Sequence, residues 1–291
     1  MCAIDSVLHQ TETAFELLVV LDGPDPATAA RFEALGDERL TVLTRHPGGN
    51  GNAARNLGVR TAAAPLIALL DDDDEWRPDH LEKMLGASTA QRGDHWALFA
   101  RFVAATQYGS ETWPTTLKVP DEQVGDYLFD RRQLLHGEAM LHPSTMVCPR
   151  SLLLAHPFDE TLTRHQDWDW LIRTEHAAGL VTSVMPDVGA TVRVQDGRVR
   201  PAFPRSEQLA WIEGVRPLIS RRAYSGYLLT QVGVRAAATK DVRLGWFALR
   251  SAVWRGRPRL RHLTVFVGLW VVPAPTRRRL RARLRRAGAT A

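Results

Sequence analysis

Four consecutive aspartates, Asp71-Asp72-Asp73-Asp74, are the strongest chemical signal in the sequence. Adjacent carboxylates repel one another, so gathering four of them is costly unless a cation neutralises part of their charge. They directly follow the apolar segment 65–70, which has the composition of a buried strand. Open α/β sheets bind ligands at the carboxyl ends of strands, and hard cations such as Mg²⁺ or Mn²⁺ take carboxylate and phosphate oxygens. The run therefore predicts a metal-assisted site, with a solvated acidic turn before the next helix as the alternative.

Two earlier segments place polar groups where the same ligand would need them. Asp22 ends another apolar run and can accept hydrogen bonds from a base or ribose, although an Asp-Gly turn explains it equally well. The glycine-rich segment 48–51 leads into a helix start suited to phosphate oxygens, with Arg55 supplying positive charge. This loop is neither a GxGxxG motif nor a P-loop, so NTP hydrolysis of the kinase type loses its main support.

A third group of candidates lies further along the chain. Asp167 and Asp169 open an amphipathic segment, where they either cap a helix or act as a general base near an acceptor hydroxyl. His142 and Ser144 are candidates for lining an acceptor pocket, with a structural role as the alternative for His142. The sequence contains neither a Gly-x-Ser-x-Gly motif nor a Cys/His cluster with zinc spacing, so serine hydrolases and zinc enzymes are unsupported.

Strand-like and helix-like segments alternate around these candidates and must position them. We expect strands at 15–21, 40–43, 65–70 and 95–104, and helices at 26–35, at 52–62 and from residue 78 onward. Strands separated by helices of this length predict right-handed βαβ units and a mostly parallel sheet. Ile4, Val7 and Leu8 have helical spacing, so the chain opens on a helix where a doubly wound sheet usually has a strand.

The charge of the 291 residues is divided unevenly along the chain. The net charge is +5, but the residues from Arg250 onward contain twelve arginines and no acidic side chain. The preceding 249 residues hold 25 basic and 32 acidic side chains. An acidic body with a basic end argues against a nucleic-acid-binding protein, whose basic residues line a folded face.

Cysteine content and hydropathy bear on the compartment. Cys2 and Cys148 cannot form a disulfide framework, so we expect a reducing compartment. No signal-peptide pattern is visible, and the longest apolar stretch, 265–275, is shorter than the ~20 residues of a membrane span. We therefore expect a cytoplasmic protein, either soluble or peripherally attached to the membrane. Helical spacing without clear strands from residue 205 predicts two parts, an α/β domain at 1–204 and a helical region at 205–291.

In their order along the chain, these segments resemble the family 2 glycosyltransferases of the GT-A fold, over roughly residues 3 to 185. The segments that carry the resemblance are AIDSVLHQT at 3–11, FELLVVLDG at 15–23, GNAARNLG at 51–58, LDDDDEWRPD at 70–79, and FDE with QDWDWL between 158 and 171. Each is moderately specific, and five in the same order are highly specific.

The resemblance implies a GT-A fold with a Rossmann-like, mostly parallel sheet flanked by helices, and a helical C-terminal extension. It implies a metal-dependent, inverting transfer of a sugar from a nucleotide-sugar donor to an acceptor hydroxyl, with Mg²⁺ or Mn²⁺ as cofactor. The acceptor would be a glycan or lipid-linked molecule in cell-envelope or polysaccharide synthesis. The implied site residues are Asp71 and Asp73 for the metal, Asp22, Arg55, Asp71 and Asp72 for the donor, and Asp167 as the catalytic base.

Three departures from the family pattern keep alternatives open. Leu21 and Pro24 replace the usual Asp and Ser, and Gln166 replaces the Glu beside the implied base. The family's first strand is absent, which we interpret as a start upstream of Met1 or a truncated, poorly active copy. A nucleotide-sugar-binding protein that has lost catalysis is therefore one alternative. A nucleotidyltransferase is a weaker one, because its usual basic, glycine-rich N-terminal loop is not visible.

The C-terminal segment suggests a separate hypothesis. Residues 263–272 are apolar and include Trp270, and residues 277–286 contain seven arginines. Each cationic residue near an anionic leaflet contributes ~1 kcal/mol to membrane attraction, and an adjacent apolar segment adds burial. We therefore expect the tail to attach the protein peripherally to the cytoplasmic face of the plasma membrane. A core-packed helix followed by a solvated basic end is the alternative.

Overall fold

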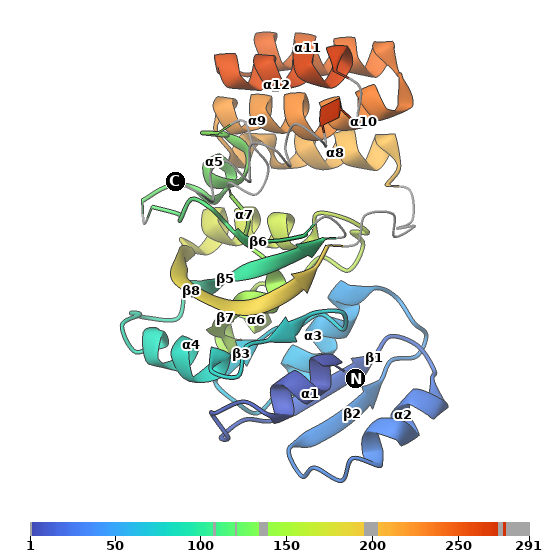
Figure 1. The fold of residues 1–291 in the computed structure, drawn as a ribbon, viewed down its shortest axis with the longest axis vertical. Helices are drawn as coiled ribbons and strands as arrows, with labels where there is room; N and C mark the ends of the chain where they lie inside the picture. Colours follow the sequence, from blue (N-terminus) through green and yellow to red (C-terminus); the bar gives the residue numbers. More distant parts are fainter. Residues whose placement is uncertain are drawn as a thin grey trace.

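The computed structural model describes residues 2–106, 109–119, 121–133, 139–194, 203–272 and 276–277. Within these residues an α/β body is followed by a stack of helices at one end of the molecule (Figure 1). The arginine-rich tail at 278–286, on which the membrane hypothesis partly depends, lies outside the described residues.

The first half of the body alternates helices and strands in the predicted order. Its elements are α1 (Cys2–Leu8), β1 (Leu17–Leu21), α2 (Pro26–Glu33), β2 (Leu40–Thr44), α3 (Gly51–Thr61), β3 (Leu66–Ala68), β4 (Glu75–Trp76), α4 (His80–Ser88) and β5 (Trp96–Thr106). All four predicted strands and three predicted helices are confirmed, with ends shifted by one or two residues. Helix α2 begins as its sequence dictates, because Asp25 accepts a hydrogen bond from the backbone N–H of Thr28 at 3.0 Å.

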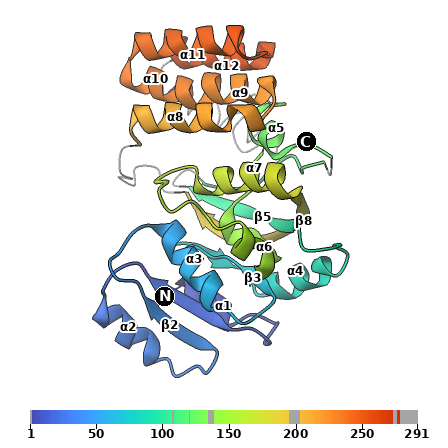
Figure 2. The same ribbon diagram turned by 180° about the vertical axis from the view of Figure 1, so that it is seen from behind.

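The second half of the body completes the large sheet and its covering helices. It contains β6 (Gly109–Trp113), α5 (Val124–Phe129), the 3₁₀ turn η1 (Pro143–Thr145), β7 (Met146–Pro149), α6 (Arg150–Ala155), α7 (Gln166–Ala178) and β8 (Val181–Arg193). Helices α3, α6 and α7 lie together on one side of the strands (Figure 2). The α/β fold class is therefore as predicted.

The prediction of a mostly parallel sheet is wrong, because the described strands form a small parallel sheet and a larger sheet of mixed pairing. β1 pairs in parallel with β2, and the larger sheet has the order β3-β7-β5-β8-β4, with β6 paired to β5. Among the described pairs of the larger sheet, β5–β8 is parallel and the other four are antiparallel. For β5 and β6 the physical reason is the connection: two residues join them, whereas a parallel crossover needs about a dozen or more.

Strand β1 is less covered than its apolar sequence predicts. All five of its residues are half-buried, where a strand covered on both faces would be buried throughout. Helix α3 approaches it closely enough for Gly58 to lie against Val20. The hypothesis of a start upstream of Met1 stays a prediction.

The C-terminal part is entirely helical over the residues that the structure describes. It comprises α8 (Arg205–Val215), the 3₁₀ turn η2 (Arg216–Leu218), α9 (Arg221–Tyr227), the π-helical turn η3 (Leu228–Val232), α10 (Gly233–Thr239), α11 (Val242–Trp254) and α12 (Leu260–Val271). α9, η3 and α10 follow one another without a break and form one long helix, with α11 and α12 lying beyond it (Figures 1 and 2). No described helix is both long and apolar enough to cross a membrane.

One apolar core joins the helical part to the body. Phe129 of α5 and Leu171 of α7 belong to the same buried cluster as Trp211 of α8, Tyr227 of α9 and Phe266 of α12. Phe129 meets both Trp211 and Tyr227 edge to face. The division at residue 205 stays a prediction, but the helical part is packed on the body and does not merely follow it.

Candidate functional site

Two aspartates and a histidine converge beyond the end of β3. Asp71, Asp74 and His142 each offer a ligand atom, and these atoms all lie within 4.8 Å of one another. His142 Nδ1 is 3.6 Å from Asp74 Oδ2, and Asp74 is buried whereas the other two are half-buried. Two carboxylates suit Mg²⁺ or Mn²⁺, and the imidazole nitrogen favours a transition-metal ion. The donor set therefore fits a divalent cation.

Ser144 forms hydrogen bonds with both Asp71 and Asp74. Its hydroxyl donates to Asp74 Oδ2 at 2.6 Å and accepts from the backbone N–H of Asp71 at 3.1 Å. Its carbonyl accepts from the indole N–H of Trp76 at 2.6 Å, and the backbone N–H of Arg193 donates to Asp74 Oδ1 at 3.1 Å. Ser144 is completely buried, which speaks against the predicted contact with an acceptor. Its geometry makes it a positioning residue for the carboxylates.

Arg55 joins three segments that are far apart in the sequence. Its Nη2 donates to Asp71 Oδ1 at 2.6 Å, and its Nη1 lies 3.5 Å from Oε1 of Gln166 at the start of α7. This guanidinium group therefore connects three segments: helix α3, the aspartate run and the start of α7. The sequence placed Arg55 and Asp71 on the donor side of one site, and the structure brings them into contact.

Asp167, the second residue of α7, directly follows Gln166, whose Oε1 lies 3.5 Å from Nη1 of Arg55. Burial raises the pKa of Asp167, while the charges of His142 and Arg55 act in the opposite direction. Burial also raises the pKa of Asp74, against the influence of His142 and the hydrogen bond from Ser144. A carboxylate with a raised pKa is the stronger base, as a group that takes a proton from a hydroxyl requires. Asp167 therefore lies within electrostatic range of His142 and Arg55, and its role as a base stays a prediction.

Asparagines of α3 fix the segment that leads to α7. The amide of Asn56 donates to the carbonyl of Phe158 at 2.8 Å and accepts from the N–H of Phe158 at 3.0 Å. The amide of Asn52 donates to the carbonyl of Asp159 at 2.6 Å. Both asparagines are buried. Neither asparagine is among the candidates predicted from the sequence, although an asparagine inside a helix, where it is a weak helix former, indicates tertiary hydrogen bonds.

His165 sets the beginning of α7 and was also not selected from the sequence. Its backbone is left-handed, with φ 59° and ψ 24°, which is uncommon for a residue other than glycine. Its ring stacks on Trp168 at a centroid distance of 4.6 Å, and its Nε2 lies 2.7 Å from the hydroxyl of Tyr227. Burial lowers the pKa of His165 to about 3, so the ring is neutral at physiological pH. The helical part therefore holds the residue two positions before Asp167.

Asp22 organises the glycine-rich loop. Its Oδ1 accepts from Nη1 of Arg45 at 3.0 Å and from the backbone N–H of Gly49 at 2.8 Å. The loop approaches so closely that a Cβ on Gly48 would lie 2.8 Å from the carbonyl oxygen of Asp22. These contacts show how the loop is held at the end of β1. The predicted contact of Asp22 with a nucleoside stays a prediction.

Three other predicted residues lie outside the convergent group. Asp72 is exposed, and Asp73 is not in the group of possible metal ligands found among the described residues, so the donor role of Asp72 and the metal role of Asp73 stay predictions. Asp169 is 2% exposed, and its Oδ1 accepts from Arg173 Nε at 2.8 Å and from the indole of Trp211 at 2.9 Å. This carboxylate joins α7 to α8, which speaks against the predicted acceptor-side role.

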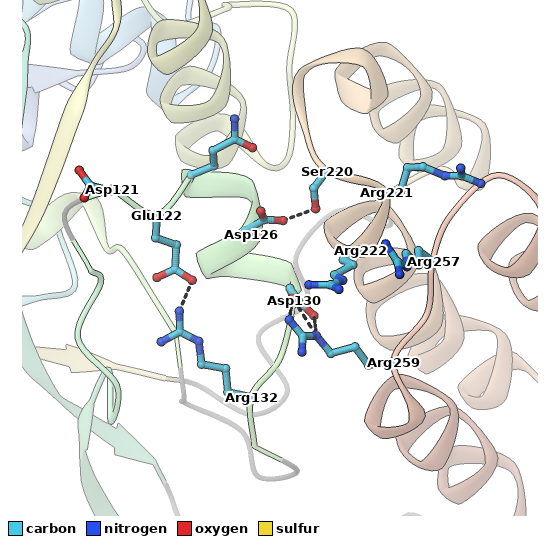
Figure 3. Close-up of a pocket in the computed structure, with 11 residues that line it drawn as sticks. Asp121, Glu122, Asp126, Asp130, Arg132, Ser220, Arg221, Arg222, Arg257 and Arg259 are labelled. Carbon is cyan, nitrogen blue, oxygen red and sulfur yellow. Dashed lines mark hydrogen bonds and ion pairs between the residues drawn. The ribbon is translucent and has the colours of Figure 1, made fainter.

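A separate pocket of about 570 Å³ opens between α5 and the helical part (Figure 3). Acidic side chains and Arg132 line the wall at α5, and four arginines with Ser220 line the wall of the helical part. Arg259 Nη2 is 2.6 Å from Asp130 Oδ2, and the hydroxyl of Ser220 donates to Asp126. None of the predicted site residues lines this pocket, so it is distinct from the Arg55–Asp71 centre.

Solved structures show which class of protein has this fold. The crystal structure of S. aureus TarS matches with a TM-score of 0.53 and 16% identity, over 86% of this chain and 52% of that chain. TarS 1-349 in complex with UDP-GlcNAc matches with a TM-score of 0.51 and 17% identity, over 92% of this chain and 74% of that chain. The fold is therefore the GT-A α/β fold.

Sequence comparison then gives the family. The model described as glycosyl transferase family 2 matches residues 3–155. The amylovoran biosynthesis glycosyltransferase AmsB of Erwinia amylovora is 25% identical over 235 residues, 78% of this chain and 77% of AmsB. The succinoglycan biosynthesis protein ExoW of Rhizobium meliloti (strain 1021) is 31% identical over 179 residues, 55% of this chain and 53% of ExoW. The chain belongs to glycosyltransferase family 2, as the sequence resemblance predicts, and is a glycosyltransferase.

The contacts of Asn56 lead to a stability prediction. We expect Asn56→Ala to lower the free energy of unfolding by about 1–3 kcal/mol, because it leaves the buried N–H and carbonyl of Phe158 unpaired. Turnover should fall as well, since the approach to α7 loses its support. Urea unfolding and donor turnover measure the two effects. Thr61→Ala, an exposed change on the same helix, is the control and should shift stability by less than about 0.5 kcal/mol. Equal stability of the two variants would contradict this role.

The neutral ring of His165 leads to a pH prediction. The unfolded chain binds a proton at this residue below about pH 6.5, whereas the folded chain does so only near pH 3. The free energy of unfolding therefore decreases as the pH is lowered through this window. His165→Asn removes the titration, so its stability deficit relative to the parent should shrink by about 1.4 kcal/mol per pH unit below about 6.5. Denaturant unfolding of both proteins at pH 7.0 and 4.5 measures the change. A deficit that stays constant between the two would count against a neutral buried ring.

Proposed function

We propose that this glycosyltransferase moves a sugar from a nucleoside diphosphate sugar to an acceptor hydroxyl, with inversion and with the help of Mg²⁺ or Mn²⁺. The observation that carries the proposal is the meeting of three segments at Arg55. This guanidinium bonds Asp71, which shares a metal-capable group with Asp74 and His142, and it meets Gln166, the residue before Asp167, at the start of α7. In this proposal, positive charge, the metal ligands and the base come from these three segments.

The donor would be held on the side of the aspartates. Asp71, Asp74 and His142 are the residues that would hold the cation, which when bound neutralises negative charge on the diphosphate leaving group. Arg55 adds a second positive charge directed at the same region. TarS, a protein of the same fold, has been solved in complex with UDP-GlcNAc, which supports a nucleotide-sugar donor.

The acceptor would approach from the side of α7. Asp167 takes the proton from the attacking hydroxyl, and the attack opposite the leaving group inverts the anomeric carbon. Ser144 keeps Asp71 and Asp74 at fixed positions during the transfer, and His165 keeps the start of α7 in place. AmsB and ExoW are named for amylovoran and succinoglycan biosynthesis, which supports a glycan or lipid-linked acceptor in polysaccharide synthesis.

A donor screen with a single substitution tests the proposed base. We expect nucleoside diphosphate release from one donor to depend on Mn²⁺ and to fall about 100-fold or more in Asp167→Asn, because general-base catalysis is worth that much. The dissociation constant of the donor should change little. Donor binding without turnover in the parent protein would instead support a nucleotide-sugar-binding protein. Release of pyrophosphate would support a nucleotidyltransferase.

A second prediction concerns the metal ligands. We expect Asp71→Asn and Asp74→Asn each to weaken Mn²⁺ binding about tenfold or more, since each removes one anionic ligand. Titration followed by electron paramagnetic resonance measures free Mn²⁺ directly. Asp79→Asn is the matched control, because that half-buried carboxylate pairs with Lys83 on α4 and is outside the metal-capable group. Asp73→Asn tests the originally predicted pair: a loss equal to that of Asp74→Asn would place Asp73 among the ligands too.

Peripheral attachment at the cytoplasmic face of the membrane, through the basic tail, is also part of the proposal. The structure changes how it must be tested. A chain that ends near Arg261 would lose α12, whose Phe266 and Leu269 are buried in the core. Substitution of the arginines at 278–286 by glutamine keeps α12 and the hydrogen bonds from Arg277 to the carbonyls of Leu269 and Val272, and is therefore the better comparison.

A further inference from the structure

The last two helices carry an unusual amount of exposed apolar surface. Thirteen large hydrophobic residues are exposed in the described part of the chain, and seven of them lie between residues 242 and 271. Trp246 is 65% exposed, Trp254 76% and Leu260 79%, whereas a tryptophan in a soluble protein is usually well buried. Such a concentration of apolar side chains marks an interaction surface.

The exposed residues form one stripe on each helix. On α11 they are Val242, Trp246 and Val253, at spacings of four and seven residues, which places them on one face. On α12 the corresponding stripe is Leu260, Val267 and Val271. We refer to these two stripes, together with Trp254, as the α11–α12 face.

Packing directs the α11–α12 face away from the protein. The opposite sides of the two helices are buried, with Leu244 and Ala248 on α11 and Phe266 and Leu269 on α12. A Cβ on Gly245 would lie 2.4 Å from the ring of Trp270, so the two helices also contact each other. Both views show them as the outermost layer of the helical part (Figures 1 and 2). The stripe side chains therefore project outward together.

The charged side chains of α11, α12 and the loop between them are all basic, while Asp241, Glu213 and Asp130 of neighbouring segments meet Leu244, Arg255 and Arg259 at the ends of the two helices. The sequence contains no acidic residue after Asp241. Exposed Arg243 and Arg250 border the α11 stripe, and the guanidinium of Arg250 lies over the ring of Trp254 at 5.7 Å. Arg257 on the connecting loop is also exposed. Two copies of this chain that met face to face would bring like charges together, which disfavours self-association.

We propose that the α11–α12 face is a docking surface for an anionic lipid bilayer. Tryptophan and aliphatic side chains enter the boundary between headgroups and acyl chains, and the bordering arginines contact the anionic headgroups. The face differs from the apolar segment singled out in the sequence. Trp270 of that segment packs against Gly245 and Phe266, so the exposed Trp246 and Trp254 replace it as the inserting aromatic residues.

Vesicle flotation of the full-length chain tests the proposal. The probes are vesicles of phosphatidylglycerol and phosphatidylcholine in equal parts, and vesicles of phosphatidylcholine alone. We expect flotation with the anionic vesicles only, and an affinity for them about ten-fold or more weaker in Trp246→Ser/Trp254→Ser. Val181→Ser, a change at a 50% exposed residue of β8, is the matched control and should float like the parent. Brominated lipids should quench tryptophan fluorescence in the parent more than in the double variant.

Other results would overturn the proposal. Unchanged flotation of the double variant, together with loss of flotation when the arginines at 278–286 become glutamine, would place all membrane binding in the tail. A parent dimer that the double variant dissociates, without vesicle binding by either, would make the face a contact between copies. Both variants should retain parental donor turnover without vesicles, because neither touches the Arg55–Asp71 centre. Failure of the docking proposal and failure of the proposed function can therefore be told apart.

Discussion

The need to neutralise a row of aspartates at the end of a strand governs the arrangement of this molecule. Repulsion among four adjacent carboxylates is relieved partly within the protein: Arg55 bonds Asp71, and Ser144 with His142 supports the buried Asp74. Arg55 comes from helix α3, whereas His142 and Ser144 both come from the turn η1 and its cap, so the site forms only when these two segments are packed against the aspartate run. The carboxylate charge that remains suits a divalent cation bound to a diphosphate. Repulsion that the protein relieves only in part therefore favours binding of such a cation.

The proposed base, Asp167, comes from a segment far along the chain, and its position depends on two sets of contacts. The asparagine amides of α3 bind the backbone of Phe158 and Asp159, and the ring of His165 is held by Trp168 and Tyr227. The left-handed backbone at His165 costs free energy that the surrounding packing must supply. Because Tyr227 belongs to α9, the helical part contributes to the position of Asp167 and is more than an appendage to the catalytic fold.

Local patterns in the sequence predicted the helices and strands and the general location of the site. They did not predict how the strands pair or which carboxylates are buried. Apolar runs and helix caps specify elements within a few neighbouring residues, which is why β1 to β3 and α2 to α4 agree with prediction. Strand direction depends on partners far away, so the antiparallel β7 could not be read locally. Asp74 and Asp169 are chemically like their neighbours, and only tertiary packing buries them against Ser144 and Trp211. Resemblance to a family carries no information about such packing.

Over the described residues, the aspartate run and the exposed arginines of α11 are far apart in space, although Arg255 and Arg259 pair with Glu213 and Asp130. The aspartates lie at the sheet, whereas α11 and α12 form the layer of the helical part farthest from it (Figure 1). Packed helices are spaced about 8–10 Å apart, and charges in salt are screened over about 8 Å, so several layers isolate the two ends electrostatically. The proposed anionic donor would therefore meet the aspartates, Arg55 and a cation, while the proposed docking of the α11–α12 face on an anionic surface would be electrostatically independent of it. The net charge of +5 therefore predicts the local charge of neither region, and the local electrostatic field is what acts on a ligand or a surface.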